Sequence, residues 1–472
     1  MDKPTRRRFL EVLGAGSVAA ATSSPLLNAL AQGMPSTSTE FFLFIHAQGG
    51  WDITVSLDPR NARNDIVMPA STDSIDPSGL MYWTDGPVRD GLTSFSMVRP
   101  AGCNIPFGPA IGLMAESRRF ERMCVINGIA MNTVSHPDGV AFSTTGRHLA
   151  GGRAAAPSVD TVLASVFGTR QLFPTVSVRF PSQFVGPGLD PKALPLRVDN
   201  IASVSRSLTR SDRYVDAATR TAVNTALATE AHEIAARSYF PAAYASLEQQ
   251  LGALERIHSD ARLSSLFSLP ALRANPAYAQ LFTPQRVGPM GPTPVTSPYT
   301  FESNNLYNAA FAVESFKLNL SRCVSFSTTS FDTHFANYED HPQHQQELFN
   351  MLAGIIDALS AADHPTLAGR KLIDHTHIMV LSDFCRTPQI NVAGGRDHYP
   401  NNSAVIISPK FRGNRVTGSS DPGQLLPNAT RTFADGMRAI TPADVLATFL
   451  SAFDIDPRRY MRDGDVMMDI RR

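Results

Sequence analysis

Histidines and acidic residues gather in one part of this sequence, in types and spacings that suit a metal centre. Seven of the twelve histidines lie between positions 334 and 398. Carboxylates and imidazoles bind Zn²⁺, Mn²⁺ or Mg²⁺, and the histidines favour zinc or manganese. Two stretches carry most of these groups: FDTH, with Asp332 and His334, and LSDFCRTPQINVAGGRDHYP (381–400), with Asp383 and His398.

Spacing narrows the choice of ligands. Asp332 and His334 stand two positions apart, so in an extended chain they lie on one side and could touch one ion. Asp397 and His398 are adjacent and would face opposite ways, so His398 is the better ligand. Asp397 is then the neighbour that orients it, or a turn former.

Each polar group follows a segment that the sequence predicts as a strand. In an open parallel sheet, ligands bind beyond the carboxyl ends of the strands, so these side chains are expected to converge. The groups are Asp52 after 41–45, Ser135 and His136 beyond 123–129, Asp332 and His334 after 323–330, and Asp383 after 376–382. Local roles stay open: Asp52 beside Gly49-Gly50 could cap a turn, His334 could bond a carbonyl, and Asp383 could pair with Arg386.

The elements that must position these residues alternate between strands and helices. This alternation predicts an α/β fold with a mostly parallel central sheet. Further predicted strands are 175–180 and 404–409, and predicted helices are about 110–122, 157–168, 303–319, 342–362 and 441–453. Residues about 200–282 lack strand signals and predict a helical insertion, which the Pro/Gly-rich connector 283–300 follows.

Composition excludes some classes of protein. The 472 residues are 43% hydrophobic and 18% charged, which is typical of a globular protein. Lys plus Arg and Asp plus Glu both total 42, so no basic excess points to nucleic acid. After the N-terminal segment no stretch approaches the 18 or so apolar residues of a spanning helix, so no stable membrane insertion is expected. The four cysteines, Cys103, Cys124, Cys323 and Cys385, allow one or two disulfides, with Cys124 and Cys323 favoured as buried thiols.

The first 31 residues have the order of an export signal. Arg6-Arg7-Arg8 is followed by a weakly apolar stretch that ends at Ala29-Leu30-Ala31, a small-residue cleavage site. The run from Thr5 to Leu10 also resembles a twin-arginine motif, which implies recognition by the twin-arginine export machinery and a periplasmic or secreted location. Residues 32–472 would then form the mature chain.

Four motifs carry a resemblance to a family of exported bacterial proteins of unknown function, grouped with the alkaline phosphatase and sulfatase superfamily. They are GGWD, FDTH, SDFCRTPQINVAGGRDH and ITPADVLATFLSAFDIDP, and they span most of the mature chain in order. The resemblance implies a three-layer α/β/α fold and, in active superfamily members, a divalent-metal centre that hydrolyses phosphate or sulfate esters. By position it implies metal ligands at Asp52, Asp332, His334, Asp383 and His398.

The sequence around the candidate nucleophile, Ser135, departs from the superfamily pattern. Sulfatases carry Cys or Ser in C/S-x-P-x-R; here Ser135 and Pro137 fit, but Gly139 stands where Arg is expected. Ser135 could still act as a metal-activated alkoxide, with His136 as base, ligand or anion contact. Phe384 follows Asp383 where active phosphatases usually have His.

Two functions follow as hypotheses. The first is an exported metal-dependent hydrolase of phosphate or sulfate esters, acting on an anionic small-molecule or glycan ester, with Arg386 or Arg396 holding the anion. The second is a non-catalytic exported protein that keeps the fold and binds an anion, a glycan or a partner protein.

Export supplies the first testable prediction. Changing Arg6 and Arg7 together to Lys should leave the precursor in the cytoplasm, because the receptor reads the arginine pair. The measurement is cell fractionation, with Arg8→Lys as the control that should still be exported and cleaved near Gln32. Normal export of the double variant would contradict the twin-arginine interpretation.

Overall fold

The computed structural model describes residues 38–59, 98–201, 216–237, 265–283, 301–328, 331–335, 337–389, 391–461 and 463–472. The predicted signal peptide lies outside these ranges, as does the 283–300 connector beyond its first residue. Within them, no helix is both long and apolar enough to cross a membrane. All four cysteines are free thiols.

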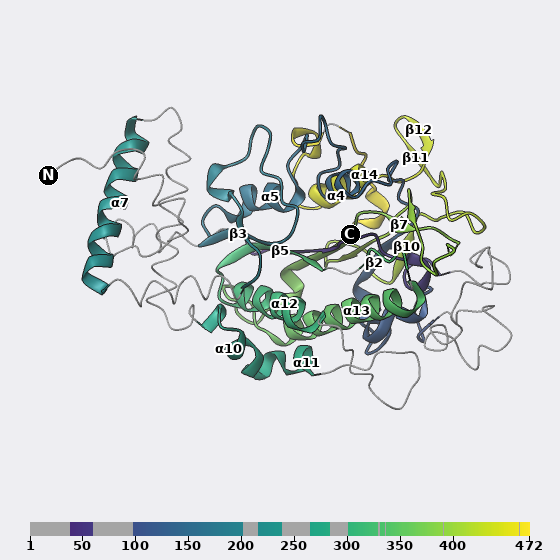
Figure 1. Cartoon of the computed structure of the whole chain (residues 1–472), viewed down its shortest axis with the longest axis horizontal. Coiled ribbons are helices and arrows are strands. Elements are labelled where there is room, and N and C mark those ends of the chain that lie inside the picture. The colour runs from purple at the N-terminus through teal and green to yellow at the C-terminus, as the bar shows by residue number, and fades with distance from the viewer. Residues whose placement is uncertain are drawn as a thin grey trace.

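One large sheet forms the middle of the molecule (Figure 1). In the described residues its strand order is β10-β2-β9-β6-β1-β5-β3-β4, and only β9 runs antiparallel to its neighbours. The prediction of a mostly parallel sheet is therefore confirmed. Its strands are β1 (Phe41–Ala47), β2 (Met123–Ile126), β3 (Phe173–Val178), β4 (Leu196–Val198), β5 (Ser321–Thr328), β6 (Thr376–Ser382), β9 (Ala404–Ile407) and β10 (Arg415–Thr417).

Helices cover both faces of this sheet and give a three-layer α/β/α fold (Figure 1). Strand β1 shows why: Phe41, Leu43 and Ile45 enter one hydrophobic core, whereas Phe42 and Phe44 enter the other. A strand that is apolar on both faces must be covered on both. One layer holds α12 (Phe301–Lys317) and α13 (Asn337–Ala361), and the other holds α4 (His136–Thr145), α5 (Val159–Leu163) and α14 (Pro442–Ser451).

The central strands end at one level, and this places the polar groups together. Ala47 at the end of β1 pairs with Thr328 of β5 on one side and Ser382 of β6 on the other. Acidic residues leave these three ends within a few positions: Asp52, Asp332 and Asp383. Two small hairpins complete the fold: β7 (Cys385–Arg386) with β8 (His398–Tyr399), and β11 (Arg431–Phe433) with β12 (Gly436–Arg438).

The described parts of the predicted insertion are helical. They are α7 (Ala217–Arg237), α10 (Leu269–Ala274), the 3₁₀ turn η7 (Pro276–Tyr278) and α11 (Ala279–Phe282). Helix α7 stands apart from the central sheet in Figure 1, whereas α10 and α11 pack on α12 and α13. Leu272, Tyr278 and Leu281 are buried in the core there, so this end of the segment is integrated into the main body.

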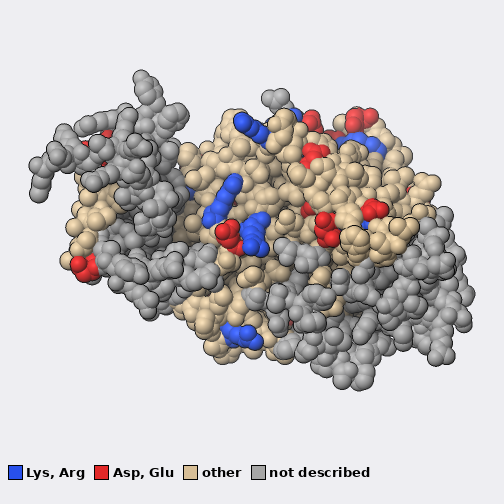
Figure 2. Space-filling model, in the orientation of Figure 1, with Lys and Arg blue, Asp and Glu red and all other residues tan. Residues whose placement is uncertain are grey.

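One segment predicted as a helix has another conformation in the structure. The stretch about 110–122 forms two 3₁₀ segments, η3 (Pro109–Ala115) and η4 (Arg119–Arg122), instead of one helix. The chain kinks at Gly112, whose φ of 53° is left-handed, and there a side chain would collide with Asn350. Charges on the face that Figure 2 shows are interspersed in sign, without one basic surface among the described residues.

The start of α14 gives a stability prediction. Thr441 and Asp444 form a reciprocal capping box in which the Thr441 hydroxyl accepts from the backbone N–H of Asp444. Thr441→Ala removes the acceptor and should lower the free energy of unfolding by about 1 kcal/mol. Thr441→Ser keeps the hydroxyl and is the control. Chemical denaturation checks this, and equal loss in both variants would contradict the capping role.

Candidate metal centre

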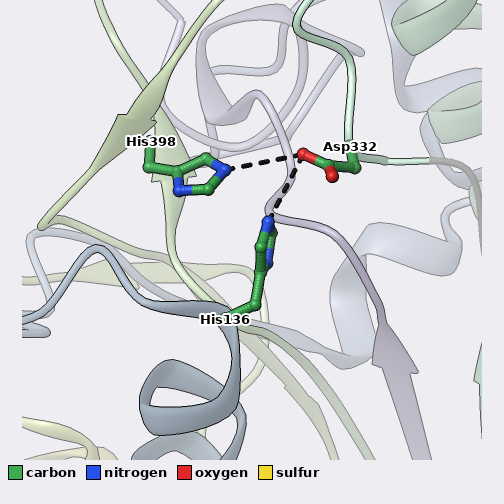
Figure 3. Close-up of side chains that lie close together, drawn as sticks. All are labelled: His136, Asp332 and His398. Atoms are coloured by element: carbon green, nitrogen blue, oxygen red, sulfur yellow. Dashed lines mark ion pairs between the residues drawn. The ribbon is translucent and has the colours of Figure 1, made fainter.

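Three side chains from separate parts of the chain meet beyond the carboxyl ends of the central strands (Figure 3). Asp332 follows β5, His136 is the first residue of α4, and His398 lies in β8. Oδ1 of Asp332 is 3.3 Å from Nε2 of His136 and 3.5 Å from Nε2 of His398. The three ligand atoms all lie within 4.8 Å of one another. In a tetrahedral zinc site with bonds near 2.1 Å, ligand atoms stand about 3.4 Å apart, so this spacing fits one ion.

His334 brings a further imidazole to the same oxygen. Its Nε2 lies 3.1 Å from Oδ1 of Asp332 and 2.8 Å from Nε2 of His398. The two-position spacing of Asp332 and His334 therefore does place them side by side. His334 thus stands beside the group of His136, Asp332 and His398, with its Nε2 also near the Asp332 carboxylate.

The second nitrogen of each imidazole is held by an acceptor. Nδ1 of His136 lies 2.6 Å from Asp383, and Nδ1 of His334 lies 3.0 Å from Asp397. Nδ1 of His398 lies 2.8 Å from the carbonyl oxygen of Val134. A carbonyl or an ionised carboxylate can only accept, so each Nδ1 carries the proton. In the neutral rings, Nε2 is then a bare lone pair, the arrangement found in metal-ligating histidines.

Bare lone pairs at this distance repel one another. Nε2 of His334 and Nε2 of His398 are 2.8 Å apart, and the Asp332 carboxylate adds negative charge beside both. Among the described residues, Nε2 of His136 is also buried without a hydrogen-bond partner. The buried Arg386 supplies one positive charge to this arrangement, and a proton or a metal cation would compensate the rest. The donor set fits a divalent ion with a preference for zinc or manganese.

The ionisation of these groups follows from their surroundings. Burial lowers the pKa of His398 below its ordinary value, which favours the neutral ring that binds a metal. The hydrogen bond to Asp383 raises the pKa of His136 against the effect of burial. For Asp332, burial works to raise the pKa, but the hydrogen bond and charge of Arg386 hold it below the usual range. Asp332 is therefore a carboxylate at neutral pH.

Asp383 stands behind the cluster. It is 1% exposed, and one oxygen contacts His136 while the other lies 3.4 Å from Nε2 of His46. The backbone N–H of Gly49 also donates to it. The structure thus places Asp383 as the carboxylate that orients His136. It pairs with histidines, and Arg386 pairs with Asp332.

The structure places Asp52 in another environment. It is fully buried, and one of its oxygens accepts from the backbone N–H and the hydroxyl of Thr54. The other oxygen accepts from Asn337 and lies 3.3 Å from Nε of Arg396. Both oxygens are thereby occupied, so Asp52 caps η1 (Ile53–Val55) and pairs with Arg396, apart from the cluster of Figure 3.

Arg386 holds the loops of the centre together. Its guanidinium is fully buried and donates to Asp332 at 2.6 Å. Its remaining donors face the backbone carbonyls of Gly49, Gly50, Phe331 and Arg396, and Nη1 also lies 3.5 Å from Nε2 of His334. A guanidinium occupied in this way positions Asp332 and has no donor left for a substrate anion.

Ser135 lies at the entrance to α4, directly before His136. It is exposed, and its hydroxyl makes no capping bond to the helix. Gly139 in the same turn packs against β6: a Cβ there would lie 2.5 Å from the carbonyl oxygen of Asp383. The arginine of the sulfatase pattern therefore has no room at this position.

Phe384 forms the floor of the cluster. Its buried ring lies 4.7 Å from the ring of His136 and 4.6 Å from that of His398, between centroids. The chain comes close beside it at Gly50, where an added Cβ would lie 2.8 Å from the phenyl ring. The ring supports the two imidazoles and, being apolar, offers no ligand atom itself.

Sequence reasoning missed one residue of the centre, His46, and gave another, Asp397, the wrong partner. His46 follows the run predicted as the first strand and gave no signal, although it ends up beside Asp383. Asp397 was expected to orient His398 but contacts His334, because β8 turns His398 toward Val134. The acidic residue next to a histidine indicated an orienting group. The sequence did not indicate which imidazole that group would contact.

Residues 315–468 match a family described as "Protein of unknown function (DUF1501)". That range includes Asp332, His334, Asp383, Arg386 and His398. No curated protein matches the chain.

Metal removal tests the centre. Wild-type protein should melt at a lower temperature with chelator, because an ion bound to the folded state stabilises it by mass action. Asp332→Asn and His398→Ala should respond less, since each removes one ligand. Differential scanning calorimetry with and without chelator is the measurement, supported by metal analysis.

Matched controls lie away from the cluster. Asp363→Asn removes an exposed carboxylate paired with Lys371, and His375→Ala removes a histidine that lies beside Glu40 before β6, at the opposite end of that strand. Both should respond to chelator as wild type does. A wild-type melting temperature that chelator leaves unmoved, with no ion found, would rule the centre out.

Proposed function

We propose that this protein is an exported, metal-dependent hydrolase of phosphate or sulfate esters. The observation that supports it most is the convergence of three imidazole Nε2 atoms on Oδ1 of Asp332, with each Nδ1 held by an acceptor. A protein that only binds a ligand does not need an exposed serine, whose hydroxyl makes no capping bond, beside such an arrangement. The resemblance to the alkaline phosphatase and sulfatase superfamily points the same way, and the three-layer α/β/α fold agrees with it.

Each residue of the site has a proposed role that follows from its position. His136, Asp332 and His398 would hold the ion and leave a fourth position open, with zinc or manganese favoured and magnesium less suited to imidazole ligands. A bound divalent ion polarises an ester and lowers the pKa of a coordinated hydroxyl or water. Ser135 would supply the nucleophile, because its hydroxyl is exposed and makes no capping bond. Asp383 holds the ring of His136 in one tautomer, and Arg386 holds Asp332 as a carboxylate.

A non-catalytic binding protein is the second candidate. Two observations favour it: Phe384 beside the imidazoles is apolar and offers no ligand atom, and Arg386 has no donor left for an anion. Such a protein would hold the same ion and use its open coordination positions to bind an anion, a glycan or a partner.

Export through the twin-arginine machinery to the periplasm or the outside belongs to this proposal. That route carries folded proteins, so the metal would be loaded before the membrane is crossed. The predicted signal lies outside the described residues, and the proposal rests on the sequence alone.

Activity of site variants separates the two candidates. Zinc- or manganese-loaded protein should release p-nitrophenol from p-nitrophenyl esters of phosphate or sulfate, and Ser135→Ala should lower kcat by about 100-fold or more. Asp332→Asn should abolish turnover together with metal binding, and Asp363→Asn should leave both intact. Metal bound without turnover of any ester would favour the binding protein.

A further inference from the structure

The electrostatics of the candidate centre limit the charge of what it can bind. Three carboxylates, Asp332, Asp383 and Asp397, touch its imidazoles, and one guanidinium, Arg386, stands beside them. One divalent ion would only neutralise this excess of negative charge. The nearby Arg396 is fully buried, pairs with Asp52 and donates to the carbonyl of Thr387. Neither arginine is left to face a second negative charge on a ligand.

Exposed apolar side chains stand on the three loops that carry the imidazoles. Among the described residues, the two most exposed large apolar side chains are Val392, at 95%, and Phe335, at 71%. Phe335 follows His334 directly and forms a bridge with Gly394. Val134 is also exposed, and its carbonyl accepts from His398. Scattered apolar residues need no explanation, but a group of them around one centre marks a binding surface.

Val392 is fixed beside the same centre. It lies in a turn that the side chain of Asn391 closes by accepting from the N–H groups of Ala393 and Gly395. The amide of Asn391 also donates to the carbonyl of His334 and to Asp397. The turn is therefore tied to the pair that holds the His334 ring, and Val392 projects from a built element of the site.

We propose that this site takes singly charged oxyanion esters that carry an apolar group, such as phosphate diesters or sulfate esters, with Phe335 and Val392 contacting that group. Doubly charged phosphate monoesters are disfavoured. The proposal rests on the metal centre of the proposed function and narrows its substrate class. It does not need the centre to be catalytic, because charge and apolar contact govern binding as well.

Binding of four ligands to the zinc-loaded full chain tests charge and apolar contact separately. Calorimetric titration near pH 8 would use phenyl phosphate, methyl phenyl phosphate, diphenyl phosphate and phenyl sulfate. Methyl phenyl phosphate differs from phenyl phosphate mainly in charge, and diphenyl phosphate exchanges its methyl for a second phenyl group. We expect about fivefold tighter binding at each of these two steps. Phenyl sulfate shows whether the sulfate ester is accepted as well as the phosphate diester.

Variants of the two exposed apolar residues test which side chains cause the gain in affinity from the second phenyl group. Phe335→Ser and Val392→Ser should each remove most of the gain from the second phenyl group and keep the gain from the lower charge. Met437→Ser is the matched control, because Met437 is 68% exposed on the β11-β12 hairpin away from the centre. It should change neither step. All three changes are at exposed positions, so melting temperatures should stay close to wild type.

Three results would overturn the proposal. The first is that phenyl phosphate binds most tightly of the four ligands, and the second is that none of the four binds. The third is that Phe335→Ser and Val392→Ser leave unchanged the ratio of the Kd values of diphenyl phosphate and methyl phenyl phosphate. Phenol release, followed separately, reports on the hydrolase function. Tight diester binding without phenol release would support this inference and count against hydrolysis.

Discussion

The buried guanidinium of Arg386 is the interaction on which the centre depends. Parallel strands β1, β5 and β6 bring their ends to one level, but strand ends do not fix the loops that leave them. Arg386 does so by donating to carbonyls of the loops after β1 and β5, to that of Arg396 before β8, and to Asp332. A buried charge must be fully paired, so the loops cannot move apart without leaving it unsatisfied. Because its donors face protein acceptors, this arginine does not serve as a ligand for an anion.

Orientation of the imidazoles depends on a second layer of contacts. Asp383, Asp397 and the carbonyl of Val134 each hold one Nδ1, and the rings of His136 and His398 rest on Phe384. These contacts fix both the tautomer and the plane of the rings. They gather Nε2 lone pairs around the Asp332 carboxylate, an arrangement that is unfavourable without positive charge between them. In the proposed metal centre, the stability of this arrangement would be linked to a bound cation.

The sequence predicted what depends on local pattern. The apolar run Phe41 to Ile45 had to be a strand covered on both faces, and Asp332 with His334 had the spacing of a shared site. The sequence could not give what depends on distant partners. Asp52 was expected as a metal ligand from its place after a strand, with a turn cap as the alternative. It caps η1, and Asn337 and Arg396 occupy one of its oxygens from far along the chain. His46 and the three-residue edge strands β4 and β10 carry no apolar periodicity, so nothing marked them.

Among the described residues, the proposed centre offers one group of ligands, enough for one ion. A second ion beside Asp383 would need ligands from the neighbouring positions, but Phe384 is apolar and both oxygens of Asp52 are taken. An ion held by His136, Asp332 and His398 would keep an open position, and under the proposal an oxyanion ester would bind there and through contacts outside the ion. Since both nearby arginines are buried, those outside contacts come from the exposed loop residues. In the proposed site, the packing that buries both arginines would therefore leave selectivity to the exposed apolar residues Phe335 and Val392.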